Sequence, residues 1–331
     1  AAVITAKDLE TLGLAWMPTI SYDTQAVLAG DKVRFHLQEV AFVIALDAYS
    51  AQDALQLIEV DYEVLPAIVN CRKALDPDAP LIRDDKVGQT DNLASPMWEA
   101  GDKATCDRVF AEADVIAKQT IFDPRSHPCP METCGMVADM NPNTGQLNIY
   151  NANQAPHAHR TVYAQVAGLP EQNIRIMCND IGGGFGNKVP VYPGYVCSIA
   201  GSIVAGAPVK WVEDRSEHMM AGGHACAQEF EAEAAVKNDG TVLGLRAPTR
   251  VYTPMVGADF TSLGAARLEL PRQAGNGRGV AVREGELAQG ALVSLDRDGS
   301  VRAMVAPSGP IQVAASRRPG CAPTLSTEAW M

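Results

Sequence analysis

Residues 173–213 read NIRIMCNDIGGGFGNKVPVYPGYVCSIAGSIVAGAPVKWVE, and this stretch decides the fold class. A strand pattern over 173–178 runs directly into a glycine loop at 181–186. An uncharged segment then predicts a helix over about 195–205, and a second strand is expected over 209–213. Three consecutive glycines permit positive φ and carry no Cβ, so a ligand can approach main-chain N–H groups in this loop.

The glycine loop does not match the two common phosphate-binding patterns. A dinucleotide fingerprint needs glycine five residues after its first, and that position counted from Gly182 is Asn187. A P-loop needs Gly-Lys-Ser/Thr, whereas Lys188 follows Asn187 here. The pattern alone leaves a tight turn and a cofactor-approach loop open, and the ring of Phe185 favours a shaped site.

The uncharged stretch 189–208 is long enough to raise the question of a transmembrane helix. Its prolines and glycines confine the helix to about 195–205, so we expect a buried core helix and no transmembrane segment. The eight cysteines form no C-x-x-C and the start is not signal-like, which favours a reduced compartment. The predicted location is cytoplasmic, with the inner face of the membrane as an alternative.

Outward from this stretch, strand and helix patterns alternate. A hairpin is expected at NPNTG (141–145), whose Pro, Asn and Gly supply turn dihedrals, and Pro156 opens a helix. A strand-turn-strand pattern surrounds Asn238-Asp-Gly240. The expected elements before the glycine loop are a helix over 102–113, strands over 115–122, 135–140 and 146–150, and a helix over 156–167.

Residues 1–75 predict a small α/β unit, and the polar, proline-rich residues 76–96 predict a linker. Ser50 is expected to cap a helix, with Asp53 completing a capping box. The sequence contains both helix patterns and strand patterns, so the predicted fold class is α+β. The expected elements of the first unit are two short strands within 33–46, a helix over 50–58 and a strand over 59–69.

The composition excludes several function classes. Lys and Arg number 27 against 39 Asp and Glu, a net charge of −12, and no basic cluster offers a surface for nucleic acid or anionic membrane. The 47% hydrophobic content argues against disorder. Residues 263–331 differ, since eight Arg, no Lys and six acidic residues give a net +2 and leave −14 for residues 1–262.

Two short motifs hold the candidate functional residues. Gln154-Ala-Pro-His157, followed by His159, lies between a strand and a helix, where a side-chain amide can donate to an oxo oxygen. The alternatives are that Gln154 caps its helix and that the histidines form a zinc pair, for which no third ligand lies nearby. In HPCPMETC (127–134) a Cys/His metal site competes with a rigid segment whose Glu132 bonds to main chain, and we favour the rigid segment. No metal-binding residue is assigned, and no G-x-S-x-G or S-x-x-K motif indicates a hydrolase.

Together, HPCPMETC, NANQAPH (151–157), NDIGGGFGNKV (179–189) and GYVCSIAGSIVAGAPVKWVEDRSE (194–217) resemble the molybdenum-binding large subunits of the xanthine dehydrogenase and aldehyde oxidase family. They are most similar to the aerobic carbon monoxide dehydrogenase branch, whose members carry HPxPxETC, QAPH and DIGGGFGNKV in this order. The similarity weakens over 225–260 and then ends.

The resemblance implies a hammerhead-like domain over 1–75 that lacks its first strands, and part of the first molybdopterin-binding domain over 97–262. The implied cofactor is molybdopterin cytosine dinucleotide with Mo. The glutamine is implied to reach an oxo ligand of the metal, and the loop main chain to lie beside the molybdenum and its dithiolene. No catalytic residue is assigned. The residues with implied cofactor contacts are Gln154, Gly183, Gly184, Phe185 and Gly186.

The same resemblance implies oxidation of CO to CO₂ with oxygen from water. Electrons would leave through an FAD-binding medium subunit and an iron–sulfur small subunit with [2Fe–2S] clusters, in a dimer of heterotrimers. An aldehyde or purine/N-heterocycle hydroxylase and a non-catalytic scaffold remnant are the alternatives. The family's copper-binding loop (A-Y-R-C-S-F) and C-terminal glutamate base have no match, so we expect copper only where that loop is present and little activity from this chain alone.

The tail, residues 263–331, lies outside this resemblance. GELAQGALVSLDRDGSVRAMV (285–305) is similar to the hairpin that opens the transpeptidase domain of bifunctional penicillin-binding proteins, with Asp298-Gly299 at its turn. It carries no catalytic motif. We therefore expect unrelated sequence, joined by fusion or by an assembly artefact, and poor order in the tail, above all from 306 onward.

Overall fold

A computed structural model of the 331-residue chain places helices and strands in the mixture predicted for an α+β protein. It forms two compact units, residues 1–100 with 120–232 and 247–268, and residues 101–119 with 233–246 and 269–331. The structure describes residues 1–18, 24–35, 37–68, 70–93, 99–223, 225, 227–252, 265–271, 291–295 and 301–305.

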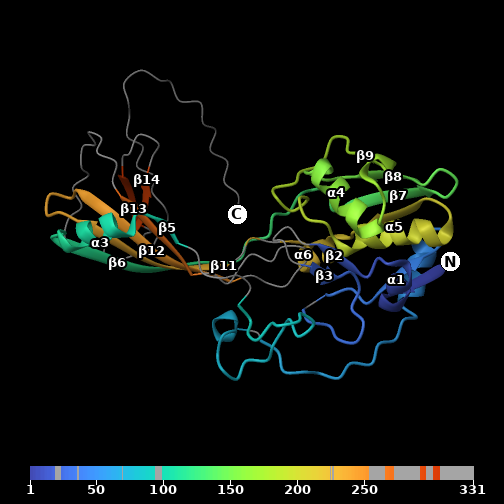
Figure 1. The fold of residues 1–331 in the computed structure, drawn as a ribbon, viewed down its shortest axis with the longest axis horizontal. Coiled ribbons are helices and arrows are strands. Elements are labelled where there is room, and N and C mark those ends of the chain that lie inside the picture. The colour runs from blue at the N-terminus through green and yellow to red at the C-terminus, as the bar shows by residue number, and fades with distance from the viewer. Residues whose placement is uncertain are drawn as a thin grey trace, which may run out of the picture. The chain divides into compact units, whose positions relative to one another are not determined.

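A four-stranded sheet in the order β10-β7-β8-β9 carries the glycine loop. Figure 1 labels three of its strands, β7, β8 and β9. The predicted hairpin is confirmed, because β7 and β8 are antiparallel with Ala138 opposite Ile149, and Gly145 has a φ of 68° in the turn. Strand β9 runs parallel to β8, and β10 runs antiparallel to β7. The strands are β7 (Gly135–Asn141), β8 (Gln146–Asn151), β9 (Ile174–Met177) and β10 (Val209–Val212).

Helix α5 (Pro193–Ala205) is the predicted core helix, and it packs on β7 and β10. Gly194 lets Trp211 approach, since a Cβ at Gly194 would lie 2.5 Å from the indole Cε2. Within the described residues, no helix is long and apolar enough to cross a membrane. Helix α4 (Pro156–Ala167) has the predicted bounds and ends at Gly168, whose left-handed conformation terminates it. The short 3₁₀ turn η2 (Glu171–Asn173) then leads into β9.

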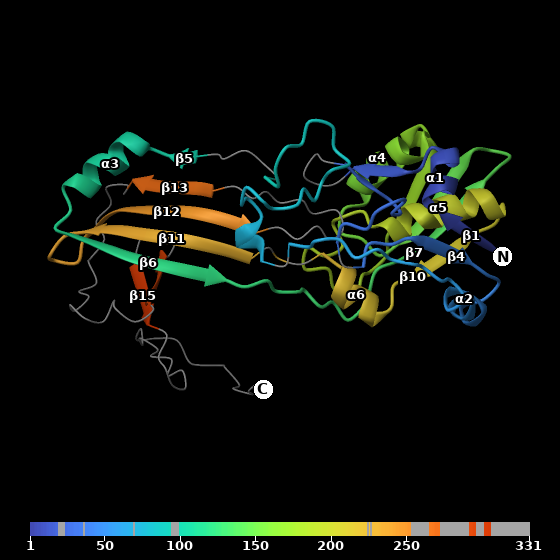
Figure 2. The same cartoon turned by 90° about the horizontal axis from the view of Figure 1, so that it is seen from below.

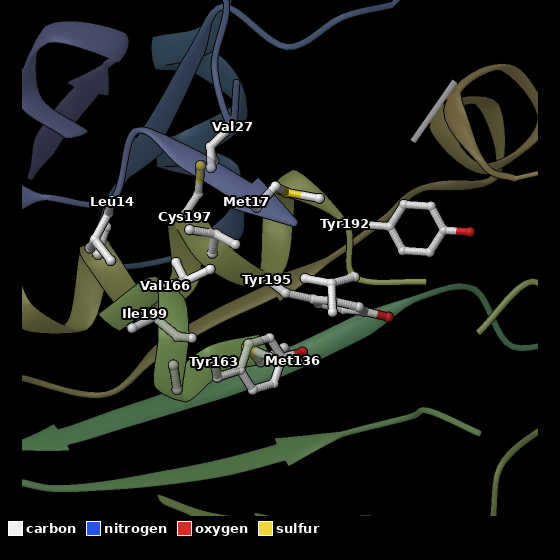
Figure 3. Close-up of a cluster of buried hydrophobic side chains, with 14 of the residues drawn as sticks. Leu14, Met17, Val27, Met136, Tyr163, Val166, Tyr192, Tyr195, Cys197 and Ile199 are labelled. Atoms are coloured by element: carbon white, nitrogen blue, oxygen red, sulfur yellow. The ribbon is translucent and has the colours of Figure 1, made fainter. Parts of the chain in front are cut away.

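One hydrophobic core joins the N-terminal segment to this sheet (Figure 3). Leu14, Met17 and Val27 from the N-terminal segment lie against Tyr195 and Ile199 of α5 in a single buried cluster. The two sequence regions are therefore packed as one body. The N-terminal elements are β1 (Ala2–Thr5), α1 (Ala6–Leu12), β2 (Trp16–Pro18), β3 (Thr24–Ala26), β4 (Ala41–Ile44), α2 (Ala48–Leu55) and the 3₁₀ turn η1 (Cys71–Lys73), with β1 paired to β4 and β2 to β3.

Three expectations for the N-terminal segment were wrong. The described residues of 33–46 form one strand, β4, where two were expected. Helix α2 begins earlier than predicted because Asp47 caps it, accepting from the Ser50 N–H at 2.9 Å. Residues 59–68 form no strand although they alternate apolar and acidic residues, and their side chains are mostly exposed. A strand needs a neighbouring edge to bond to, and this segment has no strand partner among the described residues.

A second sheet has the order β5-β13-β12-β11-β6 (Figure 2). Strands β11 and β12 form the expected strand-turn-strand, and Asp102 caps helix α3 by accepting the Thr105 N–H at 3.0 Å. The ring of Phe110 and the thiol of Cys106 are buried on this helix. The elements are β5 (Glu99–Gly101), α3 (Lys103–Ala111), β6 (Val115–Asp123), β11 (Ala227–Val236), β12 (Val242–Tyr252) and β13 (Ala265–Pro271).

The tail holds an antiparallel pair of strands, β14 (Ala291–Leu295) and β15 (Val301–Val305), with Val293 opposite Ala303. This pairing agrees with the hairpin predicted for residues 285–305. The turn expected at Asp298-Gly299 and the segment 306–331, predicted to be poorly ordered, lie outside the described residues.

Candidate functional site

The glycine loop follows β9, and three of its residues have a left-handed backbone conformation. Gly183 and Gly186 have φ values of 95° and 89°, and Phe185 between them has a φ of 53°. A bulky residue rarely adopts this region, so the surrounding contacts must hold it there. The Phe185 side chain is 74% exposed. A strained loop that presents a ring to its surroundings fits a binding site better than a simple turn.

Two glycines of the loop are in close contact with the motifs upstream. A Cβ at Gly184 would lie 2.4 Å from Cδ of Gln154, and one at Gly182 would lie 2.5 Å from Cβ of Glu132. Neither distance is possible between real atoms, so any side chain at these positions would push the neighbour away. The loop therefore packs against both the QAPH and the HPCPMETC motifs. This packing brings together the predicted site residues, which are Gln154, Gly183, Gly184, Phe185 and Gly186.

The side-chain carbonyl of Gln154 belongs to the loop. Its Oε1 accepts the N–H of Gly186 and the N–H of Lys188, each at 3.1 Å, and the Gln154 N–H donates to the Lys188 carbonyl at 3.0 Å. Because both partners are N–H donors, the atom facing them is the amide oxygen. The alternative that Gln154 caps its helix is wrong, since Ala155 is the N-cap of α4 and no side chain caps it.

This arrangement leaves a set of donors at the loop. Within the described residues, Nε2 of Gln154 makes no hydrogen bond, and the N–H groups of Gly183, Gly184 and Phe185 have no acceptor. Consecutive free N–H groups beside left-handed residues form a concavity that favours oxygen acceptors and anions. The site therefore offers hydrogen-bond donors to a ligand rich in acceptor atoms. Gly183, Gly184 and Gly186 carry no Cβ that would keep such a ligand away.

The HPCPMETC segment is fixed by hydrogen bonds, as predicted. Arg215 of helix α6 (Arg215–Ala221) donates to the carbonyl oxygens of Pro130 and Met131 at 2.9 and 2.8 Å. Thr133 Oγ1 donates to the Glu213 carbonyl at 2.7 Å. Glu132 Oε2 accepts the Gly182 N–H at 2.8 Å, which is the main-chain bond expected of this carboxylate.

Cys134, Glu213 and His218 are all buried, with ligand-type atoms within 4.8 Å of one another. Their hydrogen bonds already account for the arrangement: Glu213 Oε2 accepts from His218 Nδ1 at 2.8 Å and from the Cys134 N–H at 3.1 Å. Burial raises the pKa of the Cys134 thiol to about 12, so the metal-free thiol is neutral. We interpret the group as a structural network.

The two histidines of QAPHAH have different environments. His157 is exposed, whereas His159 is buried and uses both ring nitrogens, Nε2 at 2.9 Å from the Val189 carbonyl and Nδ1 at 3.1 Å from the Tyr163 hydroxyl. The carbonyl can only accept, so Nε2 carries the proton and Nδ1 accepts from Tyr163. With both nitrogens engaged, His159 is not free to ligate a metal. Instead it ties α4 to the residue that follows Lys188.

Protonation of His159 is expected to destabilise the fold. Burial lowers the pKa of His159, so below about pH 6.5 the unfolded chain takes up a proton more readily than the folded one. The free energy of unfolding should fall by up to about 1.4 kcal/mol per pH unit through this residue as the pH drops from about 7 towards 5. Urea unfolding of the wild type and of His159→Gln at several pH values measures this pH dependence of the free energy of unfolding.

The comparison with His159→Gln isolates one residue among several that titrate here. Burial also lowers the pKa of His127, while burial raises the pKa of Glu39 to about 7, which stabilises the folded state as the pH falls. These contributions are common to both proteins and cancel in the difference. Parallel pH profiles for wild type and variant would contradict the assignment to His159.

Sequence reasoning did not single out two residues that shape the loop. Lys188 is fully buried, and Asn187 donates through Nδ2 to the Gly223 carbonyl at 2.6 Å while its own carbonyl accepts from Tyr192 OH at 2.6 Å. The Asn-Lys pair directly after the glycines was visible in the sequence. The structural role of this pair depends on hydrogen-bond partners 5 to 56 residues away, which no local pattern specifies.

Comparison with known proteins agrees with the sequence motifs and the fold. The family model "Molybdopterin cofactor-binding domain" matches residues 86–262, and "Aldehyde oxidase and xanthine dehydrogenase, a/b hammerhead domain" matches residues 1–66. The carbon monoxide dehydrogenase large chain of Hydrogenophaga pseudoflava is 50% identical over 253 residues, which cover 74% of this chain and 32% of that protein.

A second curated relative and a solved structure give the same match. The carbon monoxide dehydrogenase large chain of Afipia carboxidovorans is 47% identical over 253 residues, 74% of this chain and 31% of that protein. The solved structure of reconstituted CO dehydrogenase from Oligotropha carboxidovorans matches with a TM-score of 0.73 and 41% identity, covering 82% of this chain and 37% of the solved chain. This chain thus spans about a third of the length of the curated relatives it matches.

A hammerhead domain and a molybdopterin cofactor-binding domain in one chain, with a glycine loop held by a glutamine, define a molybdenum-cofactor-binding class of protein. The chain belongs to the xanthine dehydrogenase and aldehyde oxidase family of molybdenum hydroxylases. The resemblance and the fold class expected from its sequence are confirmed.

Proposed function

We propose that this chain is the molybdenum-cofactor-binding part of a carbon monoxide dehydrogenase-type large subunit. The whole enzyme would catalyse CO + H₂O → CO₂ + 2H⁺ + 2e⁻. The observation that carries the proposal is the hydrogen bonding of Gln154, because Oε1 is held by the N–H groups of Gly186 and Lys188 and the two Nε2 protons are left for a ligand. The identity to carbon monoxide dehydrogenase large chains supports this substrate over an aldehyde or N-heterocycle.

The residues present fit such a cofactor. Gln154 would donate through Nε2 to an oxo group, and the free N–H groups of Gly183, Gly184 and Phe185 would face the acceptor atoms of the cofactor, with Gly186 keeping the loop close to it. When bound, the molybdenum cofactor supplies the two-electron oxidation and the transfer of oxygen from water. The chain would bind and orient the cofactor, and the glycines would allow the main chain to approach it.

Further features of the whole enzyme are part of the proposal. We place molybdopterin cytosine dinucleotide as the cofactor form, and FAD and [2Fe–2S] clusters in a medium and a small subunit, assembled as a dimer of heterotrimers in the cytoplasm. Copper would require the copper-binding loop, which has no match in this sequence. Since the glutamate base also has no match, we expect this chain to contribute cofactor binding without independent turnover.

The domain division follows from the sequence patterns and is likewise proposed. Residues 1–75 would be the hammerhead-like domain, 76–96 a linker, and 97–262 the partial molybdopterin-binding domain. Residues 263–331 would be unrelated to both. The change from a net charge of −14 to one of +2 at this boundary supports the last division.

Metal and pterin analysis tests the proposed function. The full chain is co-expressed with the medium and small subunits of a carbon monoxide dehydrogenase in a host that makes the molybdenum cofactor. We expect purified chain to retain molybdenum and pterin in equal amounts, of the order of one per chain. A folded chain that carries neither would instead support the scaffold remnant.

Replacing Gln154 by glutamate separates its two roles. A carboxylate at 154 can still accept from the Gly186 and Lys188 N–H groups, but it has no proton to donate to the cofactor. We expect Gln154→Glu to keep the melting temperature of the wild type and to lower the molybdenum content at least about tenfold. The exposed His157, replaced by Gln, is the control in the same motif and should retain molybdenum. Unchanged molybdenum content in Gln154→Glu would contradict a donor role.

A further inference from the structure

A single carboxylate oxygen holds both ends of the glycine loop. Glu132 Oε2 accepts the Gly182 N–H at 2.8 Å and the Lys188 ammonium at 2.6 Å. The Glu132 N–H returns a bond to the Gly182 carbonyl at 3.2 Å. These contacts lie on either side of residues 183–187, so the Glu132 side chain links the two ends of the loop directly.

Lys188 is an unusual place for a charge. Its side chain is 0% exposed, whereas that of Glu132 is 43% exposed and remains in contact with water. Removing an ammonium group from water is expensive, and an apolar residue of similar volume is often no less stable at such a position. A buried lysine with a half-exposed partner is therefore poorly explained by stability alone, and its geometry indicates a positioning role.

Lys188 also joins the two anchors of the loop. Its side chain bonds to Glu132, and its main-chain N–H and carbonyl bond to Oε1 and the N–H of Gln154. Displacement of Lys188 would thus loosen the hydrogen bond that orients the Gln154 amide.

We propose that Glu132 and Lys188 form an ionic clasp that positions the glycine loop and the Gln154 amide for the cofactor. Both are positioning residues, because they act through the loop. The assignment of the ligand rests on the proposed function, but the control of loop geometry does not. Breaking the clasp should leave the chain folded and release the loop amides of Gly182, Gly186 and Lys188.

Two variants and a matched control test the clasp in the full chain co-expressed with its partner subunits. Lys188→Met removes the buried charge, and Glu132→Gln keeps an acceptor for the Gly182 N–H but weakens the ion pair. Lys118→Met breaks the Lys118–Glu233 pair, which has the same 2.6 Å separation but a 68% exposed lysine. Hydrogen–deuterium exchange of peptides covering 182–188 and 135–151, the melting temperature and the molybdenum content are measured.

We expect amide exchange over 182–188 to rise at least about tenfold in Lys188→Met and less in Glu132→Gln, with the hairpin 135–151 unchanged. Molybdenum content should fall about tenfold in Lys188→Met and stay constant in Lys118→Met. Unchanged exchange over 182–188 in both clasp variants would overturn the proposal, as would faster exchange spread equally over the hairpin. If Lys188→Met does not fold, Glu132→Gln, altered at a half-exposed side chain, carries the test. A wild type without molybdenum would count against the proposed function only, because the exchange measurement still decides the clasp.

Discussion

Replacing Gly184 by alanine is expected to remove the molybdenum cofactor from this protein. The φ of Gly184 is not in the left-handed region, so alanine is allowed there by the backbone and the effect is purely steric. The new Cβ would lie 2.4 Å from Cδ and 2.6 Å from Oε1 of Gln154. The amide must move, and it then loses its hydrogen bonds to the Gly186 and Lys188 N–H groups.

We expect at least about a tenfold loss of molybdenum and pterin in Gly184→Ala, with a destabilisation of about 1–3 kcal/mol from the overlap. Metal analysis and urea unfolding measure the two effects. Gly168→Ala is the control, because Gly168 ends α4 with a φ of 63° and a Cβ added there would meet no atom within 4 Å. It should cost about 1 kcal/mol and leave the molybdenum content unchanged. A Gly184→Ala protein with full molybdenum would show that the loop does not need this close approach.

The largest loss of stability is expected from Tyr163→Ala. Tyr163 belongs to α4, and its ring is fully buried in the core that this helix shares with α5 and the sheet (Figure 3). Its hydroxyl accepts from Asn151 Nδ2 at 3.4 Å and donates to His159 Nδ1 at 3.1 Å. Truncation leaves a cavity and strands two buried polar groups, so we expect a loss of about 3–5 kcal/mol in the free energy of unfolding.

Tyr163→Phe divides this effect into packing and hydrogen bonding. Phenylalanine keeps the ring and removes the hydroxyl, so it should cost about 1–2 kcal/mol, less than the alanine variant. Because domains of this size are stable by about 5–15 kcal/mol, Tyr163→Ala should also unfold at a clearly lower temperature. Equal losses in the two variants would mean that the hydroxyl network, and not the ring, holds α4 in place.

The core of the fold was predictable because its patterns are strong and local. The uncharged run that becomes α5, Pro156 at the start of α4 and the Asn-Pro-Asn-Thr-Gly turn each specify backbone conformation within a few residues. Residues 59–68 show the limit of this reasoning. Their alternation is typical of a strand, but strand formation also needs a partner edge, which a pattern in one segment does not supply.

The candidate site was predictable as a set of residues but not as an arrangement. Gln154 and residues 183–186 were assigned from motifs, and the structure brings them together. The motif did not show which atom of the Gln154 amide faces the loop, since that depends on two N–H groups 32 and 34 residues away. His159, considered as half of a metal pair, has both nitrogens engaged with Tyr163 and Val189.

By itself, the sequence determined the family, the α+β class and the identity of the loop residues, because glycine, proline and apolar periodicity act on the backbone over short distances. Only the tertiary structure decided that one oxygen of Glu132 holds Gly182 and Lys188, and that Gln154 presents its donors outward. Hydrogen bonds and ion pairs between distant segments need their atoms placed to within a fraction of an ångström, and this placement exists only once the core has brought the segments together.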